Sequence, residues 1–129
     1  MKNLLIGLLL FVSLPACAQV IVLGKNLNTA KEVKYLKISL WQEREDGILI
    51  SRASVDYGQN NFFRAEDEST LQTPKGQLKA FKSDMDVFNF LHLNGWEYVN
   101  SWQHYFGAEP HNHASGEFYY YHLFRKKAD

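Results

Sequence analysis

Two stretches in the first half of the chain alternate apolar and polar residues with the two-residue period of a β-strand. Residues 33–41 place three apolar side chains on one face: Leu36, Ile38 and Leu40. Residues 48–55 resume an apolar run directly after the dipeptide Asp46-Gly47. Because Asp-Gly favours the tight turns that join antiparallel strands, the two stretches predict a β-hairpin.

The middle of the chain changes from a strand pattern to a helical one. Residues 77–81 follow a turn with proline and glycine and predict a short third strand. Residues 84–93 then predict a helix that begins after Ser83, a residue type that caps helices. The pair Asn94-Gly95 supplies the residue types that end helices in a left-handed turn.

The last third of the chain predicts two more strands, at residues 96–102 and 117–126, joined by a long loop at 103–116. Residues 19–31 form a short edge strand or a lead-in. The order strand, strand, strand, helix, strand, strand places one helix on one face of an antiparallel sheet of about five strands. The expected fold class is therefore α+β, in a single small domain of residues 19–129.

The helix and the strand that follows it carry a recognisable motif. Residues 83–91 lead into the Gly95-Trp96-Glu97 step, and the chain closes with the aromatic-x-Leu-x-Arg/Lys pattern of residues 121–126. This combination resembles a bacterial family of exported domains of unknown function. The resemblance implies that Gly95 makes the turn, that Trp96 packs under the helix and that Arg125 finishes the sheet. The family has no established activity, so the resemblance assigns no catalytic residue to this chain.

Residues 1–18 are typical of a cleavable signal peptide, with one positive charge followed by an apolar run too short to span a bilayer. Ala16 and Ala18 are the small residues of a cleavage site, so we expect the cut between Ala18 and Gln19. The alternative is a bacterial lipoprotein anchored at Cys17. We therefore expect an exported protein, periplasmic or extracellular, with no transmembrane helix in the mature chain.

Cleavage leaves a nearly neutral chain without cysteine. Loss of Lys2 reduces the 14 basic residues to 13, against 14 acidic ones. This balance argues against nucleic acid as a partner. Cys17 is the only cysteine, so the mature chain would have no disulfide, thiol nucleophile or thiolate metal ligand.

Three histidines in the last loop are candidate metal ligands: His104, His111 and His113. In an extended segment the last two would project to the same side, as two ligands of a zinc or copper ion would. Glu109 or His122 would have to complete the site. The alternatives are a solvated polar loop with no metal, or a zinc-binding protein or metal-dependent hydrolase.

Aromatic side chains crowd the last two predicted strands, and one helix does not cover both faces of the sheet. Simple alternation places Trp96, Tyr98 and Trp102 on one face with Phe118, Tyr120 and Phe124, and Tyr119 and Tyr121 on the other. Exposed aromatic surfaces favour contact with a partner protein, a sugar ring or a second copy of the chain. Candidate binding residues are Trp96, Tyr98, Trp102, Tyr119 and Tyr121, and the expected function is a non-enzymatic binding or interaction module, which would form a homodimer if the partner is a second copy.

Overall fold

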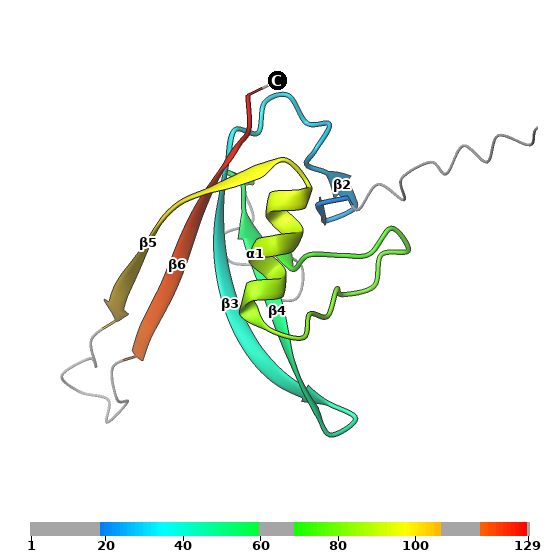
Figure 1. Cartoon of the computed structure of the whole chain (residues 1–129), viewed down its shortest axis with the longest axis vertical. Coiled ribbons are helices and arrows are strands. Elements are labelled where there is room, and N and C mark those ends of the chain that lie inside the picture. Colours follow the sequence, from blue (N-terminus) through cyan, green and yellow to red (C-terminus); the bar gives the residue numbers. More distant parts are fainter. Residues whose placement is uncertain (1–18, 60–68, 107–116, 129) are drawn as a thin grey trace, which may run out of the picture.

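The computed structural model describes residues 19–59, 69–106 and 117–128. Figure 1 shows one helix lying against a sheet of long strands. The elements follow in the order β1 (Ile21–Val22), β2 (Lys25–Asn26), β3 (Tyr35–Glu45), β4 (Ile48–Asp56), α1 (Asp84–Leu93), β5 (Trp96–Phe106) and β6 (Glu117–Lys126).

The main sheet has four strands in the order β4-β3-β6-β5, and every neighbouring pair is antiparallel. The short strands β1 and β2 form a separate two-stranded sheet. One helix packed on an antiparallel sheet confirms the predicted α+β class. The N-terminal stretch expected as an edge strand or lead-in provides β1 and β2.

The β3–β4 hairpin forms where the sequence predicts it. Asp46 and Gly47 both have positive φ angles, 49° and 81°, which is the backbone of the turn that suits twisted antiparallel strands. Glu45 therefore pairs directly with Ile48 across the turn. The strand β3 runs to Glu45, four residues past its predicted end, because this tight turn lets the ladder continue to the hairpin tip.

Helix α1 has the predicted bounds, and its two ends have the predicted chemistry. The Ser83 hydroxyl accepts a hydrogen bond from the backbone N–H of Asp86 at 3.3 Å. Gly95, with a φ of 82°, follows the C-cap residue Asn94, and this left-handed conformation is one that glycine adopts without steric cost. The chain can therefore reverse from the helix directly into β5.

The predicted third strand at 77–81 is wrong in detail. This segment makes only isolated bridges, Gln72 with Leu78 and Ser51 with Phe81. The turn at residues 73–76 folds the segment back on itself, and the chain must then leave the edge of β4 to reach the helix at Ser83. Its pairing with β4 is consequently too short to make a ladder.

The hydrophobic core lies between α1, the N-terminal segment and the helix-facing side of the sheet. Its largest fully buried side chains include Trp96, Phe124, Leu27, Leu36, Ile38, Leu71 and Leu91. Lys126 closes one end of this core, where its ammonium donates to the carbonyl oxygens of Leu27 at 3.0 Å and Ala30 at 2.8 Å. Trp96, which the resemblance implies packs under the helix, is completely buried.

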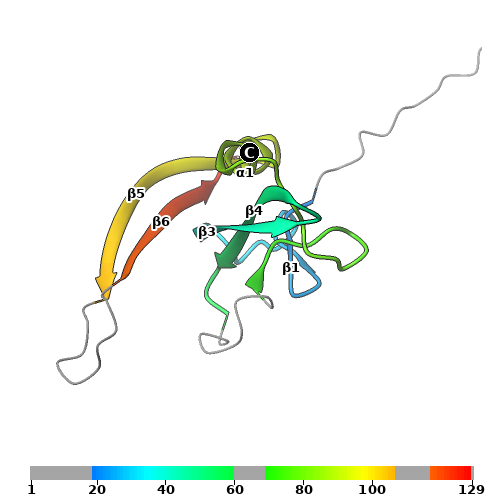
Figure 2. The same ribbon diagram turned by 90° about the horizontal axis from the view of Figure 1, so that it is seen from below.

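The β5–β6 hairpin leaves the rest of the sheet along its length. β3 pairs with β6 only from Tyr35–Arg125 to Ser39–Tyr121, whereas β5 and β6 stay paired as far as Phe106 and Glu117. Figure 2 shows this ribbon curving away from the body of the molecule. We call residues 103–106 and 117–120, which lie beyond the β3 pairing, the arm. Residues 103–106 were expected in a loop, and that expectation is wrong because β6 gives them a partner strand.

Candidate binding surface

A β-bulge sets which aromatic side chains share a face of the β5–β6 ribbon. Tyr98 pairs with Phe124, but Asn100 pairs with Leu123, so Val99 is an extra residue in β5. An inserted residue reverses the alternation of side chains beyond it. Tyr98 and Trp102 therefore lie on opposite faces, and the prediction that Trp96, Tyr98 and Trp102 share one face is wrong.

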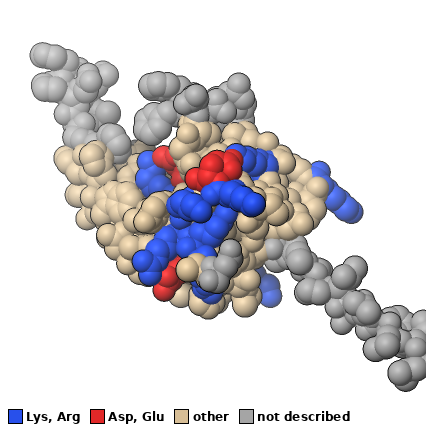
Figure 3. Space-filling model, turned by 90° about the horizontal axis from the view of Figure 1, so that it is seen from above, with Lys and Arg blue, Asp and Glu red and all other residues tan. Residues whose placement is uncertain are grey.

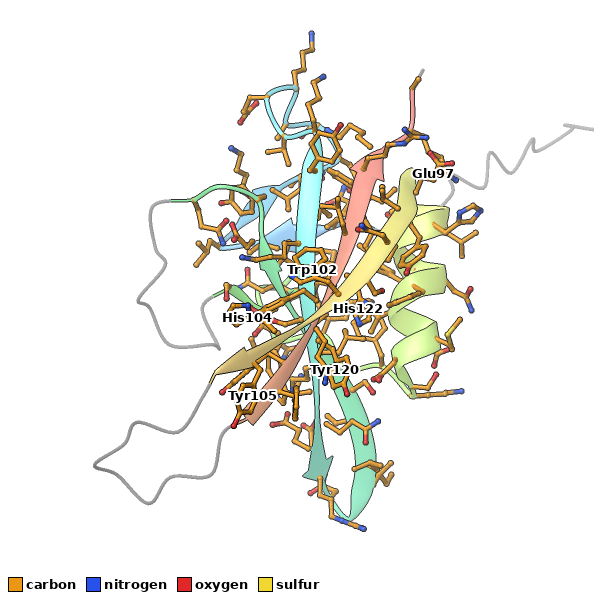
Figure 4. The ribbon with its side chains drawn as sticks, turned by 90° about the vertical axis from the view of Figure 1, so that its left-hand side faces the viewer. Glu97, Trp102, His104, Tyr105, Tyr120 and His122 are labelled. Carbon is orange, nitrogen blue, oxygen red and sulfur yellow. The ribbon has the colours of Figure 1, made fainter. Side chains whose placement is uncertain are left out.

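The face of the ribbon on the helix side carries a row of exposed groups, which we call the helix-side strip. It consists of Tyr98, Ser101, Gln103, Tyr105, Phe118, Tyr120 and His122. Four of its rings are about half exposed, with exposed fractions of 47% for Tyr98, 53% for Tyr105, 59% for Phe118 and 60% for Tyr120. Figure 4 shows Tyr105, Tyr120 and His122 on this ribbon. Single exposed apolar side chains are common on protein surfaces, but these four share one face of one ribbon, and such a grouping is typical of an interaction site.

The opposite face of the ribbon carries Trp102, His104, Tyr119 and Tyr121. The ring centroids of Trp102 and Tyr121 are 5.6 Å apart, and the Lys37 ammonium lies 5.4 Å from the centroid of Tyr121. Lys37 also pairs with Asp56 at 2.8 Å. This face therefore has a mixed aromatic and charged character next to β3 and β4.

A short chain of hydrogen bonds crosses the helix-side strip. The hydroxyl oxygens of Tyr98 and Ser101 are 2.8 Å apart, and Ser101 Oγ lies 2.6 Å from Nδ1 of His122. Further out, the Gln103 amide donates to the Tyr120 hydroxyl at 3.0 Å. Hydroxyl and amide groups between exposed rings give the strip both apolar contact area and hydrogen-bonding capacity.

The imidazole of His122 is packed edge-on against Phe88 of α1, with ring centroids 4.9 Å apart. Burial lowers the pKa of His122 below its usual value of 6.5, and the negative charge of Asp84 partly offsets this effect. The imidazole is consequently neutral at pH 7. A neutral ring has one nitrogen that accepts and one that donates a hydrogen bond.

A serine hydroxyl beside a neutral imidazole is also the pair that nucleophilic enzymes use, usually with a third group that orients the imidazole. Here the Asp84 side chain accepts a hydrogen bond from the Ser51 hydroxyl, at 2.7 Å. The contact on His122 from the helix is instead the ring of Phe88. The arrangement suits the binding of a hydroxyl-bearing molecule better than proton transfer.

Charged side chains are unevenly placed on the molecule. Residues 98–105 and 118–124 contain no Lys, Arg, Asp or Glu. The end of the molecule seen in Figure 3 instead carries many Lys and Arg side chains beside a few acidic ones. At the base of the ribbon, Arg125 and Glu97 form an exposed ion pair at 2.9 Å. Glu97 is thus a surface residue that pairs with an arginine of the neighbouring strand.

The predicted binding residues separate into three environments. Trp96 precedes the bulge and points into the core, where it is completely buried. It therefore does not belong to any exposed surface. Tyr98 belongs to the helix-side strip, and Trp102, Tyr119 and Tyr121 share the opposite face. Sequence reasoning did not include Ser101, Gln103 or Tyr105, and the alternation of residues 118–124 was the only signal for this strip.

The predicted metal ligands are only partly within the described residues. His104 lies exposed on β5, on the face away from the helix, whereas His111 and His113 lie outside the described residues. Residues 19–59, 69–106 and 117–128 contain no group of three or more His, Cys, Asp or Glu side chains that could hold a metal ion. The histidine-loop hypothesis stays a prediction. Cys17 and Ala18, of the predicted lipidation and cleavage sites, also lie outside the described part, which includes Gln19.

Comparison with known proteins gives no relative on which to base a function. No protein-family model, curated protein or solved structure matches the chain. The resemblance to an exported bacterial family stays a prediction. Within the described residues, α1 is too short to cross a membrane.

Proposed function

We propose that this chain is an exported, non-enzymatic binding module that holds its partner on the helix-side strip of the β5–β6 ribbon. The observation that carries the proposal is the helix-side strip, where four large rings lie about half exposed in a row. Contiguous exposed apolar groups on a folded protein mark interaction sites. Tyrosine contributes large contact area and a hydrogen-bonding group at low entropic cost.

The shape of the ribbon supports the same proposal. The arm extends past the last β3 pair at Ser39–Tyr121, so both of its faces are accessible beyond the body of the molecule (Figure 2). Its rings are held in place by one another, since Tyr105 and Phe118 have centroids 4.8 Å apart. A surface ordered before binding loses less entropy when the partner arrives.

Site-specific photocrosslinking in the native cells tests the proposal. A benzophenone amino acid replaces Tyr120 on the strip, and in a matched variant it replaces Tyr35. Tyr35 is 58% exposed on β3, and Tyr120 is 60% exposed, so the two positions differ in place and not in accessibility. Irradiation is followed by mass analysis of the purified protein.

We expect a covalent adduct at position 120 and little or none at position 35. An adduct of any chemical class at position 120 supports a binding surface there. Equal yields at both positions, or no adduct at either, would overturn the proposal. Elemental analysis of the same purified protein tests the histidine hypothesis separately. One metal ion per chain would favour metal binding by the loop that contains His111 and His113 as the function.

A further inference from the structure

We propose that the helix-side strip binds a neutral polysaccharide that lies along the β5–β6 ribbon with its sugar rings stacked on the exposed aromatic rings. This inference rests on the proposed binding function and names its ligand class. It is carried by three properties of the strip: the row of rings, the uncharged hydrogen-bonding groups between them, and the absence of Lys, Arg, Asp and Glu from residues 98–105 and 118–124.

The rings form an open platform whose length suits a polymer. Phe118 and His122 mark the two ends of the exposed part of β6 on this side, and Tyr98 extends it along β5 beside Phe124. Six residue steps of a strand, from position 118 to 124, span about 20 Å. The platform is longer than one sugar ring and is not enclosed, so a chain of sugar units fits it better than a single small molecule.

Neighbouring contacts fix the orientation of the rings at both ends of the platform. Tyr98 is stacked on Phe88 of α1, with centroids 5.6 Å apart and an interplanar angle of 26°. Tyr105 and Phe118 support each other at the other end, 4.8 Å apart. The C–H face of a sugar ring is apolar and flat, so it gains contact area on such fixed rings at little entropic cost.

Polar groups that match sugar hydroxyls lie between the two ring pairs. The Ser101 hydroxyl lies next to neutral His122 at 2.6 Å, and the Gln103 amide lies next to the Tyr120 hydroxyl at 3.0 Å. These groups both donate and accept hydrogen bonds. A sugar hydroxyl does the same, so it can join either pair without leaving a polar atom unpaired.

The lack of charged side chains in the central part of the ribbon argues against charged polymers and protein partners. Residues 98–105 and 118–124 contain no Lys, Arg, Asp or Glu. Nucleic acids and acidic polysaccharides draw most of their affinity from basic side chains. Protein interfaces usually surround an aromatic centre with a polar rim, and charged groups across it steer partners together. The central part of the ribbon, which is aromatic and has no charged side chain, therefore matches a neutral, hydroxyl-rich chain.

Affinity electrophoresis of the purified protein tests the ligand class. Native gels contain a soluble neutral polysaccharide, either hydroxyethyl cellulose, mannan or arabinoxylan, and a separate gel contains anionic dextran sulfate. We expect at least one neutral polymer to retard the protein and dextran sulfate to have no effect. Removal of the two most exposed rings of the strip in the double variant Phe118→Ala/Tyr120→Ala should weaken the binding about tenfold or more, since aromatic anchors carry most of an interface's energy.

Two controls keep the result interpretable. Trp102→Ala removes a large exposed ring from the opposite face of the same strands and should leave the retardation unchanged. Circular dichroism must show that the double variant is folded; if it is not, Gln103→Ala alone, at an exposed position, should reduce the retardation. Equal loss in Trp102→Ala and in the strip variants would overturn the proposal.

The failure of this proposal is distinguishable from failure of the binding function. No retardation by any neutral polymer, together with a protein adduct at position 120 in the crosslinking experiment, overturns the polysaccharide and keeps the binding module. An adduct with the mass of a second copy of the chain assigns the strip to self-association and likewise overturns the polysaccharide. Retardation by dextran sulfate alone would overturn the argument from charge.

Discussion

The hydroxyl oxygen of Ser101 lies 2.6 Å from Nδ1 of His122, across the β5–β6 pair. The two residues face each other only because of the bulge at Val99. A regular ladder continued from the Tyr98–Phe124 pair would place Asn100 opposite His122 and Ser101 on the other face. One inserted residue therefore decides which polar groups accompany the exposed rings of the helix-side strip.

The free energy of unfolding should decrease as the pH falls below about 6.5, the usual pKa of histidine. Burial lowers the pKa of His122 in the folded protein, with Asp84 opposing, so the unfolded chain binds this proton more readily than the folded one. The contribution of His122 to stability is complete above the pKa that this histidine has in the unfolded chain. It is lost as the pH falls through the lower pKa that His122 has in the folded protein. The groups around the imidazole of His122 are Phe88 and Asp84 on α1 and, on β5, Ser101 with Tyr98 hydrogen-bonded to it.

Urea denaturation at a series of pH values measures this dependence. The variant His122→Gln should flatten the curve between neutral pH and about pH 5, where histidine titrates. His92→Gln, at an exposed position near the end of α1, leaves His122 unchanged and should keep the fall. A wild-type curve that is as flat as that of His122→Gln would contradict the prediction.

Two leucines on the same helix should respond very differently to truncation. Leu91 is completely buried, whereas Leu93 is 83% exposed. Leu91→Ala should lower the free energy of unfolding by about 2–5 kcal/mol, the cost of a lost buried side chain and the cavity it leaves. Leu93→Ala should change it by less than about 0.5 kcal/mol. Chemical denaturation of both variants checks the pair, and similar losses would contradict the assigned helix face.

The first turn of α1 should depend on the side chain of Ser83. Its hydroxyl accepts a hydrogen bond from the backbone N–H of Asp86, and loss of such a cap costs about 1 kcal/mol. Ser83→Ala should therefore destabilise the protein by this amount in thermal or urea unfolding. Ser83→Asp keeps an acceptor at the same position and should retain most of the stability. An alanine variant as stable as the wild type would show that the cap contributes nothing.

Local chemistry explains why much of the fold could be predicted from the sequence. The Asp46-Gly47 turn, the Ser83 cap and Gly95 each determine the structure within a few residues of themselves. Helix α1 and strand β6 accordingly have the predicted bounds. The α+β class follows from the order of these elements, because a single helix has to cover an antiparallel sheet.

The features that the sequence could not supply are set by distant partners. Strand β5 continues to Phe106 because β6 pairs with it, and nothing within residues 103–106 signals that pairing. The bulge at Val99 is visible only in the register between two strands. Segment 77–81 has a strand pattern but makes isolated bridges, because its course along β4 is too short. The candidate strip was therefore only partly predictable, since it depends on the bulge and on the extension of β5.

Lys126 should contribute more to stability than its neighbour Lys127, although both have the same side chain. The ammonium of Lys126 donates to the carbonyls of Leu27 and Ala30 and lies 5.1 Å from the ring centroid of buried Trp96. Lys126→Met keeps the aliphatic stem but leaves the two carbonyls without this donor, at a cost of about 1–3 kcal/mol.

Within the part of the chain that the structure describes, the Lys127 ammonium donates to the exposed carbonyl of His92 at the end of α1, at 3.0 Å. Lys127→Met should therefore cost less than about 1 kcal/mol, the usual strength of a cation at a helix C-terminus. Urea unfolding followed by tryptophan fluorescence compares the two variants directly. Because the acceptors of Lys126 lie in the segment after β2, hydrogen exchange in Lys126→Met should also accelerate at residues 27–30. Equal losses in the two variants, with unchanged exchange there, would mean that Lys126 does not hold this segment against the core.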